Sequence, residues 1–400
     1  MTKRMAGNNR FLKEFNQTVI LDMIRVHKAI SRAELSKLTG LSPTAAGVIV
    51  NELLEMGYIT ESGIGESKGG RRPVLIELRP GSLYSIGIDM DVNYISLVLM
   101  DSTSRIIEEK MLAMPRTLIF EKVMKVIQHE VKNTINKYYL DTDRLLGIGF
   151  SVPGMVDSRE CKVIFAPNMG WENVDIKQHF TELPDIKVYV ENEAMASAIG
   201  ENWIGCCQEI SNFVCVNIKS GVGSGIFING KPYRGANGIT GEIGHMVVDP
   251  NGLKCRCGNY GCLETKTSSS YMVEQAKKLV KEGIASKLND IEDIEEITAK
   301  SIIDSAKAGD EAARNILLDA ARFLGLAISN IVNILNPQKI VLGKEFINYS
   351  DIVLDHLKEI VMLKALRQSS KDIEITESML GERASALGSA IIPLKVFFGK

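Results

Sequence analysis

The sequence predicts an α/β protein with a small N-terminal domain of helices and a hairpin, followed by a larger body of two similar lobes. Three observations predict this fold class. Apolar residues recur at helical spacing in three segments that end before residue 58. A strand–turn–strand pattern occurs twice in the body, with starts roughly 130 residues apart. A histidine and three cysteines crowd into eighteen positions of the second lobe, where they suit a metal ion.

Length and composition are those of a globular protein with more than one domain. The chain of 400 residues is too long for one small domain and fits two or three. No uninterrupted apolar run reaches the roughly 18–20 residues that span a bilayer. The first residues also lack the apolar segment of a secretory signal. We therefore expect a cytoplasmic protein with no membrane partner.

The charge of the chain is unevenly distributed. Residues 1–80 carry 12 Lys and Arg against 8 Asp and Glu, which gives a net charge of +4. The whole chain carries −2, so the remainder carries −6. A mildly basic N-terminal domain on an acidic body permits nucleic-acid binding by that domain without proving it.

Two helices are predicted first. Residues 16–26 have the apolar spacing of one helical face, formed by Val19, Ile20, Met23 and Ile24. Ser31 is the expected N-cap of a second, short helix, because Glu34 follows three residues later and completes a capping box. Gly40 ends this helix. Leu35 and Leu38 are expected to face inward.

A third helix begins at Ser42-Pro43 and ends at Gly57, because a capping serine precedes a proline at the first helical position. Its expected buried stripe is Ala46, Ile49, Val50 and Leu53. Two strands, at residues 58–61 and 74–78, flank a glycine-rich loop at 63–73. Together these elements predict a winged helix-turn-helix, whose third helix enters the major groove of DNA.

The groove-facing positions of the third helix are small and uncharged. Base reading would therefore depend on Ser42, Thr44 and Asn51 and on methyl contacts to thymine. Arg71 and Arg72 in the wing suit phosphates or a minor groove. The alternative is a protein-interaction domain with two arginines on a solvated turn. Helix spacing, wing and charge together favour DNA binding.

The body begins near residues 81–82, and each of its lobes opens with a hairpin, at residues 84–101 and 213–228. Lobes duplicated in this way enclose a cleft. The loop at 220–225, Ser-Gly-Val-Gly-Ser-Gly, either wraps a phosphate with backbone N–H groups or is a structural turn. The turn of the first hairpin has no glycine, and Asp91 adds a negative charge where a nucleotide phosphate would sit.

A cluster of metal-ligand residues stands in the second lobe. His245, Cys255, Cys257 and Cys262 make a complete tetrahedral set for zinc, with no position left for a catalytic water. In a cytoplasmic chain such crowding indicates a metal before a disulfide. We expect one structural zinc ion, and the alternative is a cluster of reduced thiols.

Carboxylates surround this cluster. Glu242 and Glu264 lie in glycine-rich turns, and the segment 191–193, Glu-Asn-Glu, follows an apolar strand. Carboxylates and amides fixed at strand ends bind sugar hydroxyls. Any one of these acids alone is typical of a surface, but three beside glycine turns and a metal set favour a sugar site.

These residues resemble the ROK family (repressors, open reading frames, kinases) along nearly the whole chain. The most specific match is Gly-Glu-Ile-Gly-His at 241–245 followed by Cys-Arg-Cys-Gly-Asn-Tyr-Gly-Cys-Leu-Glu at 255–264. The N-terminal domain, with Gly-Gly-Arg-Arg-Pro at 69–73, resembles that of the repressor branch, which the sugar kinases lack. Supporting matches are found at residues 151–154, 166–171 and 336–343.

The resemblance implies a two-lobed actin-like (hexokinase-type) ATPase fold with a structural zinc site for residues 83–400, behind a DNA-binding domain of residues 1–80. One lobe would comprise residues 83–190 with the C-terminal helix 381–400, and the other residues 191–380. His245 would serve both zinc and a sugar hydroxyl. The implied sugar-binding residues are Gly154, Asn192, Glu193, Glu242, His245 and Glu264.

Three departures from the family kinases concern their chemistry. The kinases have an aspartate general base where this chain has Glu193, which is longer by one methylene. They have Asp-x-Gly-Gly-Thr where residues 89–93 read Asp-Met-Asp-Val-Asn, and paired glycines where this chain has Gly343-Lys344. Sugar and zinc features remain while nucleotide features are lost, which fits a sensor that kept its ligand and lost its reaction.

We therefore expect a repressor of sugar-utilisation genes that binds a palindromic operator as a homodimer, or as a tetramer, and binds a sugar without phosphorylating it. The chain most resembles the xylose repressor branch, so xylose is the expected sugar, with glucose and amino sugars as alternatives. The main competing hypothesis is an ATP-dependent sugar kinase with an appended DNA-binding domain. A weaker one is a zinc-stabilised interaction protein with no ligand.

Overall fold

The structure is a computed structural model, which describes residues 9–65, 72–141, 143–183 and 185–400. The chain divides into two compact units. The N-terminal unit comprises residues 1–152, 158–190 and 389–400, and the C-terminal unit comprises residues 153–157 and 191–388. Each unit is therefore built from segments that are not contiguous in the sequence.

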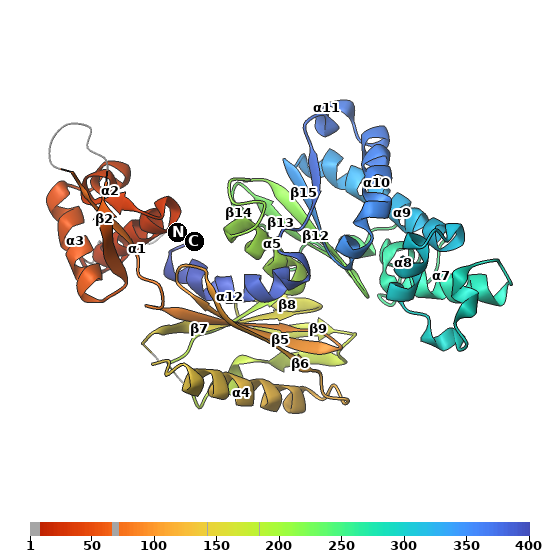
Figure 1. Cartoon of the computed structure of the whole chain (residues 1–400), viewed down its shortest axis with the longest axis horizontal. Helices are drawn as coiled ribbons and strands as arrows, with labels where there is room; N and C mark the ends of the chain where they lie inside the picture. Colours follow the sequence, from red (N-terminus) through yellow and green to blue (C-terminus); the bar gives the residue numbers. More distant parts are fainter. Residues whose placement is uncertain (1–8, 66–71, 142, 184) are drawn as a thin grey trace. The chain divides into compact units, whose positions relative to one another are not determined.

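The N-terminal unit begins with three helices and a small antiparallel sheet (Figure 1). The helices are α1 (Asn9–His27), α2 (Arg32–Thr39) and α3 (Pro43–Glu55). The strands, in the sheet order β1-β3-β2, are β1 (Ile30–Ser31), β3 (Val74–Leu78) and β2 (Ile59–Ile64). This confirms the predicted helices and hairpin of a winged helix-turn-helix. Residues 66–71 of the predicted wing lie outside the described residues.

The predicted helix ends of this domain are confirmed in detail. The Ser31 backbone N–H donates to the Glu34 carboxylate at 3.0 Å, and the Glu34 N–H donates to the Ser31 hydroxyl at 3.3 Å, which is a complete capping box. Gly40 adopts a φ of 71° at the end of α2. Ser42 caps α3 by accepting the N–H of Ala45. The predicted stripe of α3 is fully buried.

One inward-facing prediction for α2 is wrong. Leu35 is fully buried, but 53% of Leu38 is exposed. A residue three positions on is rotated by roughly 60° around a helix. In a helix of eight residues only the face centred on Leu35 is covered, so Leu38 falls at its edge.

A five-stranded sheet follows the winged helix in the N-terminal unit. Its strand order is β11-β7-β4-β5-β6, in which β4 is antiparallel to β5 and parallel to β7. The hairpin predicted at residues 84–101 is confirmed. The elements are β4 (Tyr84–Met90), β5 (Tyr94–Asp101), β6 (Ile106–Ala113), α4 (Phe120–Lys137), β7 (Leu145–Val152), β9 (Lys162–Ala166), β10 (Trp171–Asp175), η1 (Lys177–Phe180) and β11 (Val188–Asn192).

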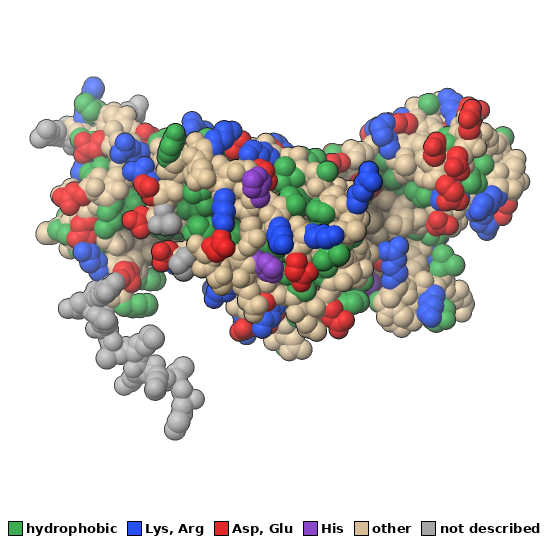
Figure 2. All heavy atoms as spheres, turned by 90° about the horizontal axis from the view of Figure 1, so that it is seen from below, with side chains coloured by type: hydrophobic (Ala, Val, Ile, Leu, Met, Phe, Trp, Pro, Cys, Tyr) green, Lys and Arg blue, Asp and Glu red, His purple; other side chains and the backbone are tan. Residues whose placement is uncertain are grey.

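Helix α4 is amphipathic. Its buried face includes Val123, Ile127 and Val131. Its polar side chains form ion pairs, such as Lys132 with Glu182. Figure 2 views the molecule from below, and acidic and basic side chains are interspersed on that face. This mixture accords with a net charge of only −2.

The end of the chain packs against the winged helix within the same unit. The last helix, α12 (Ala384–Phe397), begins in the C-terminal unit and ends in the N-terminal unit. The ring of Phe397 meets that of Tyr58 edge-on, with centroids 5.8 Å apart. The Lys400 ammonium lies 2.9 Å from the Asp22 carboxylate of α1. Within the N-terminal unit, the winged helix thus contacts the end of α12 and the residues that follow it.

The C-terminal unit contains a second five-stranded sheet, with the order β14-β13-β12-β15-β16. When the five strands of each sheet are numbered in chain order, both sheets have the order 3-2-1-4-5, with the first sheet read from its β6 edge and the second from its β14 edge. This shared order confirms the predicted repeat of the lobes. The elements are β8 (Met155–Asp157), α5 (Glu193–Trp203), β12 (Phe213–Ile218), β13 (Val222–Ile228), β14 (Lys231–Pro232), η2 (Ile243–His245), α6 (Glu264–Thr267), α7 (Ser269–Lys281), η3 (Lys287–Asp290), η4 (Ile294–Glu296), α8 (Ala299–Lys307), α9 (Glu311–Leu335), β15 (Lys339–Lys344), η5 (Glu345–Asn348), α10 (Ser350–Lys364), α11 (Arg367–Ser370), β16 (Glu374–Glu377) and η6 (Gly381–Arg383).

Helix α9 is long and apolar enough to cross a membrane by length and composition alone. Of its most apolar 18-residue window, 61% is buried inside the protein. It packs against α8 and α10, and its side chains Leu317, Leu324 and Ile328 belong to the core of the C-terminal unit. These contacts are those of a core helix.

Candidate metal centre and ligand site

Four predicted metal ligands come together in the C-terminal unit. His245 lies on η2, and Cys255, Cys257 and Cys262 lie on the loop that follows. Their ligand atoms all lie within 4.8 Å of one another. The His245 Nδ1 is 3.7 Å from the Cys255 sulfur, and the sulfurs of Cys257 and Cys262 are also 3.7 Å apart. This arrangement can hold a tetrahedral metal ion.

The loop that carries the cysteines is shaped by its own backbone. The Cys255 N–H donates to the Asn259 carbonyl at 2.7 Å, and the Gly258 N–H donates back to the Cys255 carbonyl at 3.0 Å. At Gly261, with φ 70°, a Cβ would stand 1.6 Å from the Asp249 carbonyl oxygen. Only glycine fits there, so the close approach of the two strands of this loop depends on that residue.

Asn192 and Gly154 form one part of the predicted sugar site. Asn192 is the N-cap of α5, where its side-chain oxygen accepts the N–H groups of Ala194 and Met195 at 2.9 and 3.2 Å. Its Nδ2 donates to the Gly154 carbonyl at 2.8 Å. Because a side-chain amide has two N–H donors, Asn192 retains one for a ligand. Its carbonyl oxygen is already committed to the helix.

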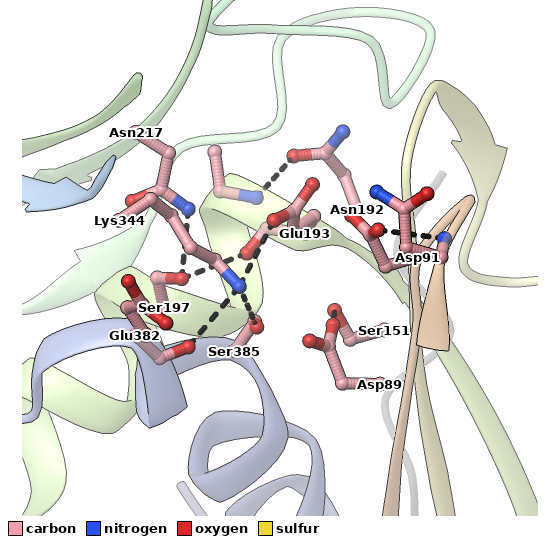
Figure 3. Close-up of polar contacts among 12 residues, drawn as sticks. Asp89, Asp91, Ser151, Asn192, Glu193, Ser197, Asn217, Lys344, Glu382 and Ser385 are labelled. Carbon is pink, nitrogen blue, oxygen red and sulfur yellow. Dashed lines mark hydrogen bonds and ion pairs between the residues drawn. The ribbon is translucent and has the colours of Figure 1, made fainter. Parts of the chain in front are cut away.

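Glu193 lies beside Asn192 and forms an ion pair that sequence reasoning missed. Its Oε1 is 3.0 Å from the ammonium of Lys344, at the end of β15 (Figure 3). Lys344 also donates to the Ser385 hydroxyl at 2.6 Å and to the Glu382 carbonyl at 3.3 Å. The sequence analysis treated Lys344 only as the replacement of a glycine, and no pattern in the sequence indicates Glu193, 151 positions earlier, as its partner.

Glu242, His245 and Glu264 form the second part of the site. The His245 Nε2 is 3.9 Å from a Glu242 carboxylate oxygen, and the Glu264 carboxylate accepts the N–H of Val222 at 3.3 Å. Burial raises the pKa of Glu242, the nearby His245 lowers it, and the negative charge of Glu264 raises it further. The three side chains are therefore close enough to influence one another.

Strand β13 brings the two parts together. Val222 binds Glu264, and a Cβ on the adjacent Gly223 would lie 3.3 Å from the Ala194 side chain in the first turn of α5. Ser224 donates through its N–H and its hydroxyl to the Gly241 carbonyl, at 2.9 and 3.0 Å. Consecutive residues of one strand thus hold α5, the 241–245 turn and α6. All six predicted sugar-binding residues belong to this unit.

The loop predicted at residues 220–225 is shorter than expected, because residues 222–225 already belong to strand β13, and close packing accounts for the glycines of this segment. A Cβ at Gly225 would stand 2.5 Å from the Ala194 carbonyl oxygen, and one at Gly221 would stand 2.9 Å from the Glu264 carboxylate. Of the two sequence interpretations, the direct contacts support a structural role for these glycines, although Gly225 lies in a strand and not in a turn.

The turn of the first hairpin, in the N-terminal unit, is closed on itself. The Asp91 carboxylate accepts the N–H of Asn93 at 2.9 Å, and the Asp91 N–H donates to the Tyr94 carbonyl at the same distance. Asp91 is 6% exposed. The Asn93 N–H is therefore occupied by this carboxylate and the Asp91 N–H by the Tyr94 carbonyl, and neither is available to a phosphate.

The predicted DNA-contacting residues of α3 lie on its exposed side. Ser42, Thr44 and Asn51 are all exposed. The Asn51 side-chain oxygen accepts from Arg32 of α2 at 3.4 Å, and Arg32 also pairs with Glu61. Arg72 is exposed, and Arg71 lies outside the described residues. Arg32 was not singled out from the sequence, because its position beside α3 arises only from the packing of the helices.

Comparison with known families assigns both parts of the chain. Residues 85–396 match the ROK family, and residues 17–60 match a family described as winged helix-turn-helix DNA-binding. The chain belongs to the ROK family. Its C-terminal and N-terminal sheets are accordingly those of the α/β, actin-like fold of ROK sugar kinases, behind a winged helix-turn-helix.

Relatives of this ROK chain include two transcriptional regulators and a kinase. It is 34% identical over 382 residues to the xylose repressor of Caldicellulosiruptor bescii, with 96% of each chain covered. A ROK family transcriptional regulator described as a homolog of the E. coli MLC protein has a TM-score of 0.85 at 27% identity, covering 97% of both chains. A ROK glucokinase from Streptomyces griseus, solved with glucose and AMPPNP, has a TM-score of 0.68 at 28% identity and covers 77% of this chain and 98% of its own.

The packing of β13 leads to a prediction on stability. Gly225→Ala should destabilise this ROK protein by about 1–3 kcal/mol, because the new methyl meets backbone atoms that cannot move away. Gly223→Ala is the matched control, since its methyl meets only the Ala194 side chain at 3.3 Å. Chemical denaturation of the full chain measures both. Equal stability of the two variants would contradict the packing role of Gly225.

Proposed function

We propose that this ROK protein is a sugar-responsive transcriptional repressor that binds a sugar without phosphorylating it. The observation that supports the proposal is a contrast within one fold, between acceptor side chains of the kind that bind sugars and residues that differ from those of the family kinases. Glu242, His245 and Glu264 interact, whereas Glu193 is paired with a buried lysine. A relative that shares 96% of its length with this chain is named a xylose repressor, which supports xylose as the effector.

Zinc is the metal that suits the ligand set. Two thiolates bound at about 2.3 Å from a tetrahedral zinc ion stand roughly 3.7–3.8 Å apart. The Cys257 and Cys262 sulfurs are 3.7 Å apart, so the pair needs almost no adjustment. Four protein ligands close the coordination shell, which gives zinc a structural role and contributes on the order of 10 kcal/mol to ordering the loop.

The sugar would be held by acceptors from three segments. Glu193, Glu242 and Glu264 supply carboxylate oxygens, and Asn192 supplies its remaining N–H. His245 would bind zinc through Nδ1, which faces Cys255, and a sugar hydroxyl through Nε2. The backbone near Gly154 completes the set, and Asn192 holds that segment in place.

Phosphoryl transfer depends on positioning and on a cradle for the phosphates. Here Asp91 occupies the first turn, and its charge would repel a nucleotide phosphate by about 1–4 kcal/mol at 4 Å, depending on screening. The Glu193 carboxylate differs from an aspartate by one methylene and already pairs with Lys344. Misplacing a catalytic group by about 1 Å costs about 10²-fold in rate. Both effects oppose kinase activity.

Residues 1–80 would bind DNA, and residues 83–400 would form the sugar-binding domain, with lobes of 83–190 plus 381–400 and of 191–380. In this proposal a cytoplasmic homodimer, or a tetramer, presents paired winged helices to a palindromic operator. Sugar must bind two arrangements of the protein with different affinity in order to alter operator binding.

Metal content provides the first test of the proposal. Purified protein should contain one zinc ion per chain, and Cys262→Ser should lower this content and the melting temperature together. Cys206→Ser is the control, because Cys206 is a cysteine outside the cluster. Elemental analysis of protein purified under reducing conditions measures the content. A full-length protein with no bound zinc contradicts the zinc assignment.

Operator binding provides the second test. Asn51→Ala should weaken binding by about 1–3 kcal/mol and relax base preference, as expected for a base contact. Arg71→Ala or Arg72→Ala should weaken binding to all sequences, or mainly to A·T-rich flanks, and reduce the salt dependence by about one charge. Lys371→Ala, an exposed lysine of the C-terminal unit, should change neither. Absence of any footprint upstream of sugar-utilisation genes argues against a regulator.

Sugar binding without turnover provides the third test. Calorimetry with xylose, glucose and amino sugars, with and without ATP, should find a sugar that binds and alters operator affinity. Glu242→Ala should abolish this effect and leave operator binding intact, because Glu242 and the winged helix belong to different units. The exposed Glu292→Ala is the control. In a coupled assay with ATP and magnesium, turnover near about 1 s⁻¹ would favour a sugar kinase.

A further inference from the structure

Lys344 is a buried cation at the point where strand β15 ends. Only 2% of its side chain is exposed, and its backbone has φ 59° and ψ −135°. Positive φ favours glycine, so a lysine in this conformation costs free energy that its surroundings must offset. The offset has to come from the side chain, since the backbone conformation is the unfavourable part.

The contacts of the ammonium supply that offset. An ammonium has three N–H donors. The acceptors around it include the Glu193 carboxylate at 3.0 Å, the Ser385 hydroxyl at 2.6 Å and the Glu382 carbonyl at 3.3 Å. They come from α5, α12 and η6, which all meet at this lysine (Figure 3). A buried charge is tolerated when it is paired and hydrogen-bonded, as the Lys344 ammonium is.

The first turn of α5 is fixed from a second side by the neighbouring strand. Asn217 of β12, which pairs with Gly343 of β15, donates to the Ser197 hydroxyl at 2.9 Å. Ser197 donates in turn to the Glu193 carbonyl at 3.1 Å. The Glu193 backbone is therefore held through Ser197, and its carboxylate is held separately by Lys344.

From this geometry we propose that Lys344 is a positioning residue for the effector. Its ammonium binds one oxygen of Glu193 and so fixes the carboxylate with the other oxygen presented to a sugar hydroxyl. Glu193 is the more accessible partner, with 19% of its side chain exposed. This inference rests on the proposed role of Glu193 in sugar binding. It assigns to Lys344 a function in affinity that is separate from support of the fold.

A double-mutant cycle distinguishes this role from a structural one. Xylose affinity is measured by calorimetry for the full-length protein, for Lys344→Met, for Glu193→Gln and for the double variant. Lys344→Met should weaken xylose binding about tenfold, which corresponds to about 1.4 kcal/mol. In the Glu193→Gln background the same change should have an effect below about twofold, because Lys344 acts through the carboxylate.

Two further variants keep the cycle interpretable. Lys339→Met removes another buried lysine of β15, whose ammonium binds Glu374 and the Cys206 carbonyl, and it should leave xylose affinity unchanged. Lys344→Gln retains a hydrogen-bond donor near Ser385 without the charge, and it replaces Lys344→Met in the cycle if that variant fails to bind operator in the absence of sugar. Operator binding without sugar thus serves as the check of folding for every variant.

The outcomes separate this inference from the proposed function. Two results would overturn the positioning role while the sugar-sensor function stands, provided that the unmodified protein binds xylose. In the first, the Lys344 and Glu193 substitutions weaken xylose binding additively. In the second, the Lys344 variants bind xylose as tightly as the unmodified protein. If the unmodified protein does not bind xylose but binds glucose or an amino sugar, the same cycle is measured with that sugar. If the unmodified protein binds no sugar of the panel, both the function and this inference are overturned.

Discussion

The candidate ligand site depends on the close approach of strand β13 to three neighbouring segments. Val222 binds Glu264, Gly223 and Gly225 leave room for α5, and Ser224 holds the turn before Glu242. A side chain at Gly225 or Gly241 would overlap backbone atoms. The positions of Glu242 and Glu264 therefore depend on strand β13 and on the glycines that allow its close packing. The candidate metal centre depends on the same strand, because His245 lies in the 241–245 turn, and Ser224 binds the first residue of that turn.

Much of this architecture could be predicted from local residue patterns. The capping box at Ser31 and Glu34 and the glycine at position 40 are each determined within a few residues, and the structure contains them. The cluster of His245 with three cysteines was predictable for another reason, since the chemistry of metal ligands restricts which residues can crowd together. The repeated hairpins indicated two similar lobes, because each hairpin opens an equivalent sheet.

What could not be predicted depends on contacts between distant segments. Leu38 has the spacing of a core residue, but an eight-residue helix does not cover it. The Asn192 oxygen is committed to capping α5, which leaves a single N–H where the sequence suggested a complete amide. From the sequence, Lys344 was interpreted only as the replacement of a glycine of the family kinases. In the structure its ammonium contacts residues of α5, η6 and α12. In each case the sequence identified the residue type, and tertiary packing decided its role.

The packing of the chain's last residues on the winged helix has a consequence for synthesis. The winged helix leaves the ribosome more than 300 residues before Phe397 and Lys400, which contact Tyr58 and Asp22. At about 5–20 residues per second the intervening chain takes roughly 16–60 s to be made. During that interval the DNA-binding domain is complete in sequence but lacks its C-terminal partner. The nascent domain and the finished one therefore present different surfaces to DNA and to chaperones.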